Sequence, residues 1–113
     1  MSISWGVKER IKFIAAGPLT SWKPPAVPAV YAITCKQNPD RPKMHTVLFF
    51  GQANDLSRET HELDRQVIDA WKSSGHDVSE LYVFVHPIPG STSGQRFKMQ
   101  EQLVAEYRPP CNR

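Results

Sequence analysis

The clearest indication of the fold lies in AVYAITCKQNPDRPKMHTVLFFG, residues 29–51 of this chain of 113 residues. Its two ends, residues 29–35 and 45–50, are rich in β-branched and aromatic residues, which favours two strands. The segment between them, residues 36–43, is polar and contains two prolines, as turn and loop segments commonly do. Because so short a loop joins antiparallel neighbours, the two strands are predicted to pair with each other.

Helices are expected on either side of this hairpin. Apolar residues near one side of a helical wheel, followed by a Gly-Pro stop, predict a first helix over residues 4–16, ahead of a proline-rich connection. The other predicted elements are a helix over residues 54–72, a strand over residues 81–86 and a helix over residues 92–107, which starts with a Thr-Ser-Gly-Gln capping box. The expected fold class is α/β, with helices flanking a small antiparallel sheet of at least three strands, in the order α-β-β-α-β-α.

The length of the chain limits its domain organisation. A chain of 113 residues supports one modest hydrophobic core, so residues 1–113 are expected to form a single domain. Within it, residues 1–27 would supply the first helix and the proline-rich connection, and residues 28–112 the core of the fold. The apolar fraction of 40% is that of an ordinary globular protein and argues against overall disorder.

Charge is unevenly distributed along the sequence. Residues 1–43 carry seven Lys/Arg and two Asp/Glu, which gives +5, whereas residues 44–80 carry three and seven, which gives −4. A basic first part suits a phosphate-bearing partner such as DNA, and the alternative is that these charges only form solvated faces. If nucleic acid binds, the expected contacts come from basic residues and not from the acidic middle helix. These basic residues are Lys8, Lys12, Lys23, Lys36, Arg41 and Lys43.

The two cysteines, Cys35 and Cys111, bear on the cellular compartment. Two cysteines form no disulfide framework, and their spacing fits no metal motif, so a reducing compartment and a cytoplasmic location are expected. The charged, amphipathic start of the chain does not look like a signal peptide. No stretch approaches the roughly 18 consecutive apolar residues that a membrane span needs, so no membrane partner is expected.

Particular residues within these elements resemble the motifs of the GIY-YIG nuclease domain. Residues 29–31 (Ala-Val-Tyr) look like the first motif of that family, and residues 49–51 (Phe-Phe-Gly) look like the second. The segment GQANDLSR, residues 51–58, resembles the passage from the glycine into the following helix. The segment QEQLVAEYRPPCN, residues 100–112, is similar to the closing helix with its Pro/Asn end. The likeness covers roughly residues 28–112.

The resemblance implies metal-dependent hydrolysis of phosphodiester bonds in DNA. In the family a glutamate binds a divalent ion, Mg or Mn, which polarises the phosphate. A tyrosine hydroxyl helps to deprotonate the attacking water, and an arginine neutralises the charge that develops on the phosphoryl oxygens. Carried over to this chain, the catalytic candidates are Tyr31, Arg58, Glu101 and Asn112, with Glu101 as the metal ligand.

Three positions depart from the family pattern. Phe49 replaces the second tyrosine and has no hydroxyl to move a proton. Glu59 stands at the arginine position, one residue after Arg58, and Gln100 stands at the glutamate position, one residue before Glu101. A neutral amide is a poor sole ligand for a hard divalent ion. On a helical wheel, Arg58 is expected to point away from the core and Gln100 to face the sheet, with Glu101 on its flank.

Three functions of different class therefore remain open. The first is an active, divalent-metal-dependent DNA endonuclease with a divergent site. The second is a catalytically silent relative that binds nucleic acid or a protein partner. The third is an unrelated α/β interaction domain in which the short motifs occur by chance. Because one fold supports many functions, the site itself has to decide among them.

Overall fold

The computed structural model describes residues 2–36, 45–59 and 61–112, with the side chains of residues 59 and 61–64 outside that description. The strands are β1 (Ser2–Trp5), β2 (Ile11–Pro18), β3 (Ala29–Lys36), β4 (His45–Ala53) and β5 (Leu81–Pro87). The α-helices are α1 (Leu56–Glu59), α2 (His61–Ser73) and α3 (Ser93–Tyr107), and two short 3₁₀ helices are η1 (Val78–Glu80) and η2 (Pro110–Asn112). The result is a mixed α/β fold.

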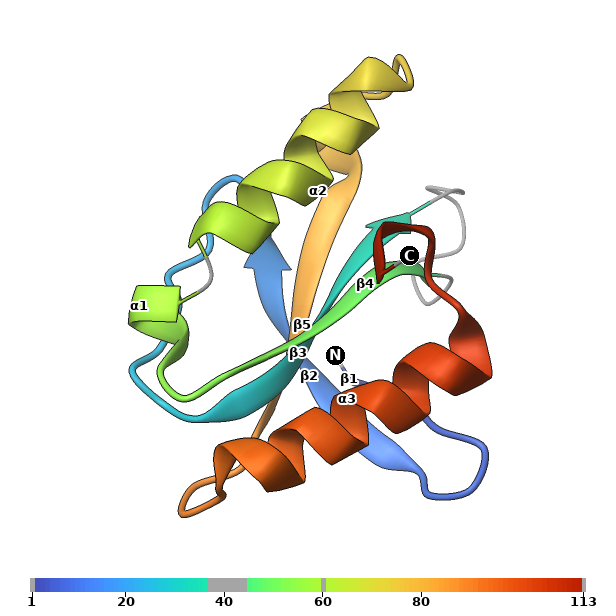
Figure 1. Cartoon of the computed structure of the whole chain (residues 1–113). Coiled ribbons are helices and arrows are strands. Elements are labelled where there is room, and N and C mark those ends of the chain that lie inside the picture. The colour runs from blue at the N-terminus through green and yellow to red at the C-terminus, as the bar shows by residue number, and fades with distance from the viewer. Residues whose placement is uncertain (1, 37–44, 60, 113) are drawn as a thin grey trace.

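The five strands form one antiparallel sheet in the order β1-β2-β5-β3-β4. Strand β3 lies inside the sheet and is buried along almost its whole length, because elements pack on both of its faces. Figure 1 shows α2 on one side of the sheet and α3 on the other. We call these two sides of the sheet the α2 face and the α3 face.

Side chains that alternate along the strands build one hydrophobic cluster on each face. On the α2 face, Tyr31, Ile33 and Cys35 of β3 pack with Leu56 of α1 and Val67 of α2. On the α3 face, the cluster consists of Trp5, Ile11, Phe13, Val30, Ala32, Phe50, Phe84 and Leu103. This alternation with a period of two is what a sheet covered on both sides requires.

The sheet curls around the α3 face. Phe50 lies on β4, at one end of the strand order, and Trp5 and Phe13 lie on β1 and β2 at the other end. Their rings nevertheless meet, with centroids 6.0 Å apart for Trp5–Phe50 and 6.0 Å for Phe13–Phe50. Contacts between aromatic rings therefore close this side of the core.

The predicted first helix over residues 4–16 is wrong, because this segment forms the β1–β2 hairpin. Its apolar residues alternate, with Ile11 and Phe13 buried and Lys12 exposed, which is a strand period rather than a helical one. Gly6 permits the turn, since its φ of 123° favours glycine and an added Cβ would lie 1.9 Å from the Glu9 carbonyl oxygen. In the described part of the chain the order is therefore β-β-β-β-α-α-β-α.

The remaining elements fall close to their predicted positions. Strands β3 and β4 pair antiparallel, with Tyr31 opposite Gly51, so the predicted hairpin is confirmed. The rings of Tyr31 and Phe49 lie on the same face of the sheet, with centroids 6.0 Å apart. The capping box is also confirmed, because Thr92 and Gln95 exchange side-chain-to-backbone hydrogen bonds at the start of α3. The predicted second helix appears as α1 and α2.

Candidate functional site

Tyr31 belongs to the core rather than to a cleft. Its side chain is 0% exposed and packs in the cluster on the α2 face. The ring lies directly against the backbone of Gly51, where a Cβ atom would be 2.5 Å from Cζ and 2.7 Å from the hydroxyl oxygen. A phenol enclosed in this way has no access to a phosphodiester in solution.

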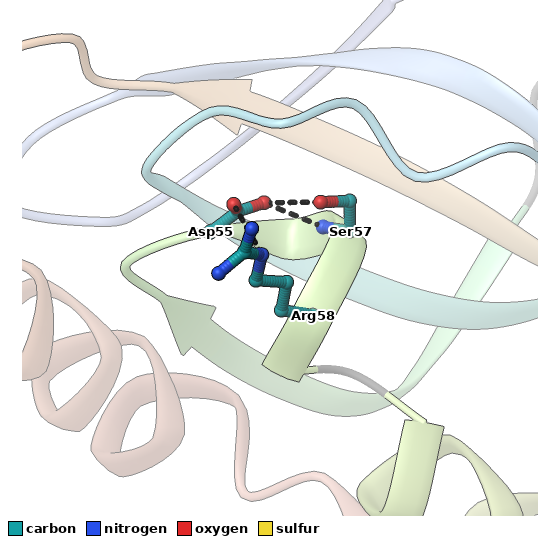
Figure 2. Close-up of polar contacts among 3 residues, drawn as sticks. All are labelled: Asp55, Ser57 and Arg58. Atoms are coloured by element: carbon teal, nitrogen blue, oxygen red, sulfur yellow. Dashed lines mark hydrogen bonds and ion pairs between the residues drawn. The ribbon is translucent and has the colours of Figure 1, made fainter.

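Arg58 points away from the core, as the helical wheel predicted. Its side chain is 83% exposed, and its Nε atom lies 3.8 Å from a carboxylate oxygen of Asp55. Asp55 also accepts hydrogen bonds from the backbone N–H and the hydroxyl of Ser57, at 2.9 and 2.5 Å (Figure 2). Asp55 therefore caps the start of α1, while Arg58 is a surface residue whose ion pair contributes little to stability.

Glu101, the predicted metal ligand, lies away from Tyr31, another catalytic candidate, which is at the centre of the sheet. It lies exposed on α3, whereas Leu103 of the same helix is buried on the α3 face. Tyr31 lies on the other face of the sheet. Among the described residues, no group of three or more His, Cys, Asp and Glu side chains could hold a metal ion. The structure therefore places Glu101 and Tyr31 on different sides of the sheet.

Asn112 and Gln100 bind the backbone of the edge strand β4. The Asn112 carboxamide accepts a hydrogen bond from the Phe50 N–H at 2.7 Å and donates one to the Phe50 carbonyl oxygen at 2.9 Å. Gln100 faces the sheet, as predicted, and donates to the same carbonyl at 2.9 Å. The two amides thus take the place of a neighbouring strand at Phe50, which protects an otherwise open edge. Asn112 has a structural role in this arrangement.

Replacing Asn112 with alanine is expected to lower the free energy of unfolding by about 1–2 kcal/mol, because two backbone hydrogen bonds at Phe50 are lost. Urea denaturation measures this. Asn112→Asp should cost at least as much at neutral pH, since a carboxylate cannot donate to the Phe50 carbonyl. Its stability relative to the wild type should recover on acidification, when the carboxyl group regains a proton. A neutral effect of both substitutions would contradict the role assigned to Asn112.

The four residues that the resemblance selected do not converge on one site. Tyr31 is enclosed on the α2 face, Arg58 extends into solvent from α1, and Glu101 is exposed on α3. Asn112 lies at the edge of β4. The side chain of Glu59, at the family's arginine position, is outside the described part. A functional site has to be sought in other places in the molecule.

Arg96 is a buried cation that sequence reasoning missed. It lies on α3, is 1% exposed, and forms four hydrogen bonds to neutral oxygen atoms. Nη1 donates to the carbonyl and hydroxyl oxygens of Ser91 at 2.8 and 2.7 Å, and Nε donates to Gln52 Oε1 at 3.2 Å. Nη2 donates to Asn54. Arg96 thus ties α3 and the loop before it to the end of β4.

A cavity of about 580 Å³ lies at the C-terminal end of β3, between that strand, the end of α2 and η1. Its size falls within the roughly 300–1,000 Å³ of typical small-ligand sites. It is lined by Cys35, Lys36, Leu48, Trp71, His76, Ser79, Glu80 and Tyr82. Aromatic, apolar and charged side chains from several elements therefore share one concave surface.

A stacked aromatic pair forms part of this cavity. The rings of Trp71 and His76 lie 4.3 Å apart with an interplanar angle of 22°. The Trp71 indole N–H donates to the backbone carbonyl of Asp77 at 2.9 Å, which fixes the indole against the segment that follows α2. The two stacked rings therefore form part of the cavity wall.

Opposite charges line the same cavity. The basic residue Lys36 and the acidic residue Glu80 are both among its lining residues. Cys35 lies buried at the cavity wall, where burial and, to a lesser degree, the Glu80 carboxylate raise the pKa of its thiol. Because a raised pKa disfavours the thiolate, Cys35 is not set up as a nucleophile. Cys35 and Cys111 are both free thiols.

A smaller cavity of about 290 Å³ adjoins the first through shared residues. Lys36 and Tyr82 line both cavities, and the smaller one is otherwise formed mainly by apolar atoms of β2 and β5 and by His45. The His45 ring packs edge-on against Tyr82 at 5.3 Å and against Phe84 at 4.9 Å. Aromatic surface therefore continues past Lys36 around this end of the sheet.

The fold defines a class of protein, namely a small α/β domain whose curled antiparallel sheet carries helices on both faces. Compared with models of protein families, with curated proteins and with solved structures, the chain gives no match. None of the helices in the described residues is long and apolar enough to cross a membrane. The likeness to the GIY-YIG domain rests on its short motifs alone.

Proposed function

We propose that this chain is a non-catalytic domain that binds single-stranded nucleic acid through the cavity beside Trp71 and His76. The proposal is based on one cavity that contains both the stacked Trp71–His76 pair and the basic residue Lys36. Single-stranded nucleic acids are bound by this combination, in which bases stack on aromatic rings and basic side chains follow the phosphates.

The two adjoining cavities favour a strand over a single nucleotide. A base that stacks in the larger cavity would place its neighbour near Tyr82 and His45, which line the smaller one. Lys36 lines both cavities. In the proposed complex its ammonium would contact the phosphate that joins the two nucleotides. Lys36 is one of the basic residues that the charge distribution selected, and Arg41 and Lys43 of that set lie outside the described residues. The proposed contribution of Trp71 departs from the expectation that the acidic middle helix makes no contact.

Cleavage is not included in the proposal. Catalysis in the family's manner requires a tyrosine hydroxyl, an arginine and a metal-bound glutamate around one phosphate. Tyr31, Arg58 and Glu101 lie in three different places in this fold. We therefore propose that the cavity binds single-stranded nucleic acid without cleaving it.

Fluorescence anisotropy with a labelled oligothymidylate tests the proposal. The wild type is expected to bind at low salt, and the affinity should fall with rising salt because Lys36 displaces counterions from the phosphates. Replacing His76 with alanine should weaken binding by about tenfold, in line with the roughly 1–3 kcal/mol that a base gains by stacking. His76 is exposed, so its removal should leave the fold intact.

Lys36→Gln and Lys98→Gln form a matched pair for the same assay. Both remove one positive charge, but Lys98 is exposed on α3 and does not line the cavity. Only Lys36→Gln should reduce both the affinity and its dependence on salt. Equal effects of the two substitutions would place binding elsewhere. Cleavage of the oligonucleotide by the wild type on addition of Mg²⁺ or Mn²⁺ would favour the nuclease hypothesis instead.

A further inference from the structure

We infer that the larger cavity selects a guanine base, which stacks beside Trp71 and His76 while Glu80 accepts hydrogen bonds from its Watson–Crick edge. This inference rests on the proposed function and adds the chemical identity of the base. It depends on where Glu80 is held, on the acceptor-only chemistry of its carboxylate, and on the opposite charge of Lys36.

Glu80 is tied to the aromatic pair by a short, hydrogen-bonded segment. Asp77 caps η1 by accepting a hydrogen bond from the backbone N–H of Ser79 at 2.9 Å. The carbonyl of the same Asp77 accepts the Trp71 indole N–H at 2.9 Å. Glu80 ends η1, immediately before Leu81 begins β5 in the core. Glu80 and the aromatic surface are therefore anchored to one another and to the sheet.

Glu80 brings a negative charge to the cavity. Glu80 lines the cavity together with Ser79. Its charge also reaches the cavity wall, since it adds to the effect of burial in raising the pKa of the Cys35 thiol. An ionised carboxylate offers two oxygens that accept hydrogen bonds and none that donates. A base bound here therefore has to present donors to Glu80.

Guanine is the base whose edge meets this requirement. Its N1–H and exocyclic N2–H₂ groups are neighbouring donors that match the two oxygens of a carboxylate. Adenine and cytosine place a ring acceptor beside their amino group, and thymine and uracil flank N3–H with carbonyl oxygens. These acceptors form no hydrogen bond with the acceptor-only Glu80 carboxylate, so the other bases gain stacking in the cavity but no paired hydrogen bonds.

Lys36 complements Glu80 on the same cavity. Guanine carries two acceptors, O6 and N7, away from its N2 amino group, and lysine is a common partner for them. The Lys36 ammonium has three donors, enough to bind a base acceptor and a phosphate. Donors and acceptors of guanine thus both find partners of the opposite kind in one cavity.

Anisotropy titrations with single-stranded oligothymidylates that carry one central guanine, hypoxanthine, adenine or cytosine test the inference. The guanine strand should bind more tightly than the hypoxanthine strand by about tenfold, because hypoxanthine lacks the N2 amino group and with it one hydrogen bond to a charged acceptor. Adenine and cytosine strands should bind no better than plain oligothymidylate. In Glu80→Gln the preference for guanine over hypoxanthine should disappear.

Glu9→Gln is the matched control, since Glu9 is exposed in the β1–β2 turn and does not line the cavity. It should keep the guanine preference while changing the net charge by the same amount. Equal affinities for the four strands, or a preference that survives Glu80→Gln, would overturn the inference and leave the proposed function standing. If plain oligothymidylate and all four strands fail to bind at low salt, the proposed function fails as well.

Discussion

Replacing Arg96 with methionine is expected to lower the free energy of unfolding by about 2–4 kcal/mol. Methionine has nearly the same length but no donor, so the oxygens of Ser91, Gln52 and Asn54 lose their shared partner. Removing the buried charge recovers its desolvation free energy, but four charge-assisted hydrogen bonds are lost. The loss is larger, because the partly buried oxygens of Ser91 and Gln52 can be only partly rehydrated. Equilibrium denaturation in urea measures the difference.

Arg58→Met is the control for this experiment. It removes the same guanidinium from a side chain that is 83% exposed and whose ion pair with Asp55 spans 3.8 Å. Surface substitutions of this kind usually change stability by less than about 0.5 kcal/mol. A similar loss for Arg58→Met and Arg96→Met would show that the buried hydrogen bonds of Arg96 do not stabilise the junction of α3 and β4.

The substitution Gly51→Ala is expected to destabilise the protein by about 3 kcal/mol, at the upper end of the usual cost of overpacking. The new methyl carbon would lie 2.5–2.7 Å from two ring carbons and the hydroxyl oxygen of Tyr31. Tyr31 is 0% exposed, so its ring cannot move without displacing the rest of the cluster on the α2 face. Thermal and urea denaturation both report the loss.

Two further variants separate this steric effect from a general effect of removing a glycine. Gly94→Ala in the first turn of α3 meets no atom closer than 3.9 Å, so it should leave stability unchanged or raise it by up to about 1 kcal/mol. In a Tyr31→Leu background, where the outer ring atoms are absent, adding Gly51→Ala should cost less than about 1 kcal/mol. If the destabilising effects of Tyr31→Leu and Gly51→Ala are fully additive, the predicted clash between the new methyl group at position 51 and the Tyr31 ring is refuted.

The central hairpin was predictable because its information is local. Residues 29–35 and 45–50 have strand composition, and the loop between them is polar and short enough to require antiparallel pairing. The same kind of local signal gave the capping box at the start of α3. The β1–β2 hairpin was missed although Ile11 and Phe13 alternate with exposed residues, because spacing over a longer window was also compatible with a helix.

The site was less predictable because it depends on contacts between distant segments. Trp71, Lys36 and Glu80 come from three separate elements, and only the fold brings them to one cavity. The hydrogen bonds of Asn112 to Phe50 depend on which strand lies at the edge of the sheet. Arg96 was missed because arginine is rarely buried, and composition gives no sign that Ser91, Gln52 and Asn54 surround it.

The indole N–H signals of the three tryptophans in a ¹⁵N-resolved NMR titration report directly on whether nucleic acid binds beside Trp71. An oligothymidylate is expected to shift the signal of Trp71, which lines the cavity, and to leave that of Trp5, buried under the α3 face, in place. The shift should saturate at the affinity measured by anisotropy and should shrink with added salt. A Trp71 signal that stays unmoved while the oligonucleotide binds, or while other signals shift, would contradict binding at this cavity.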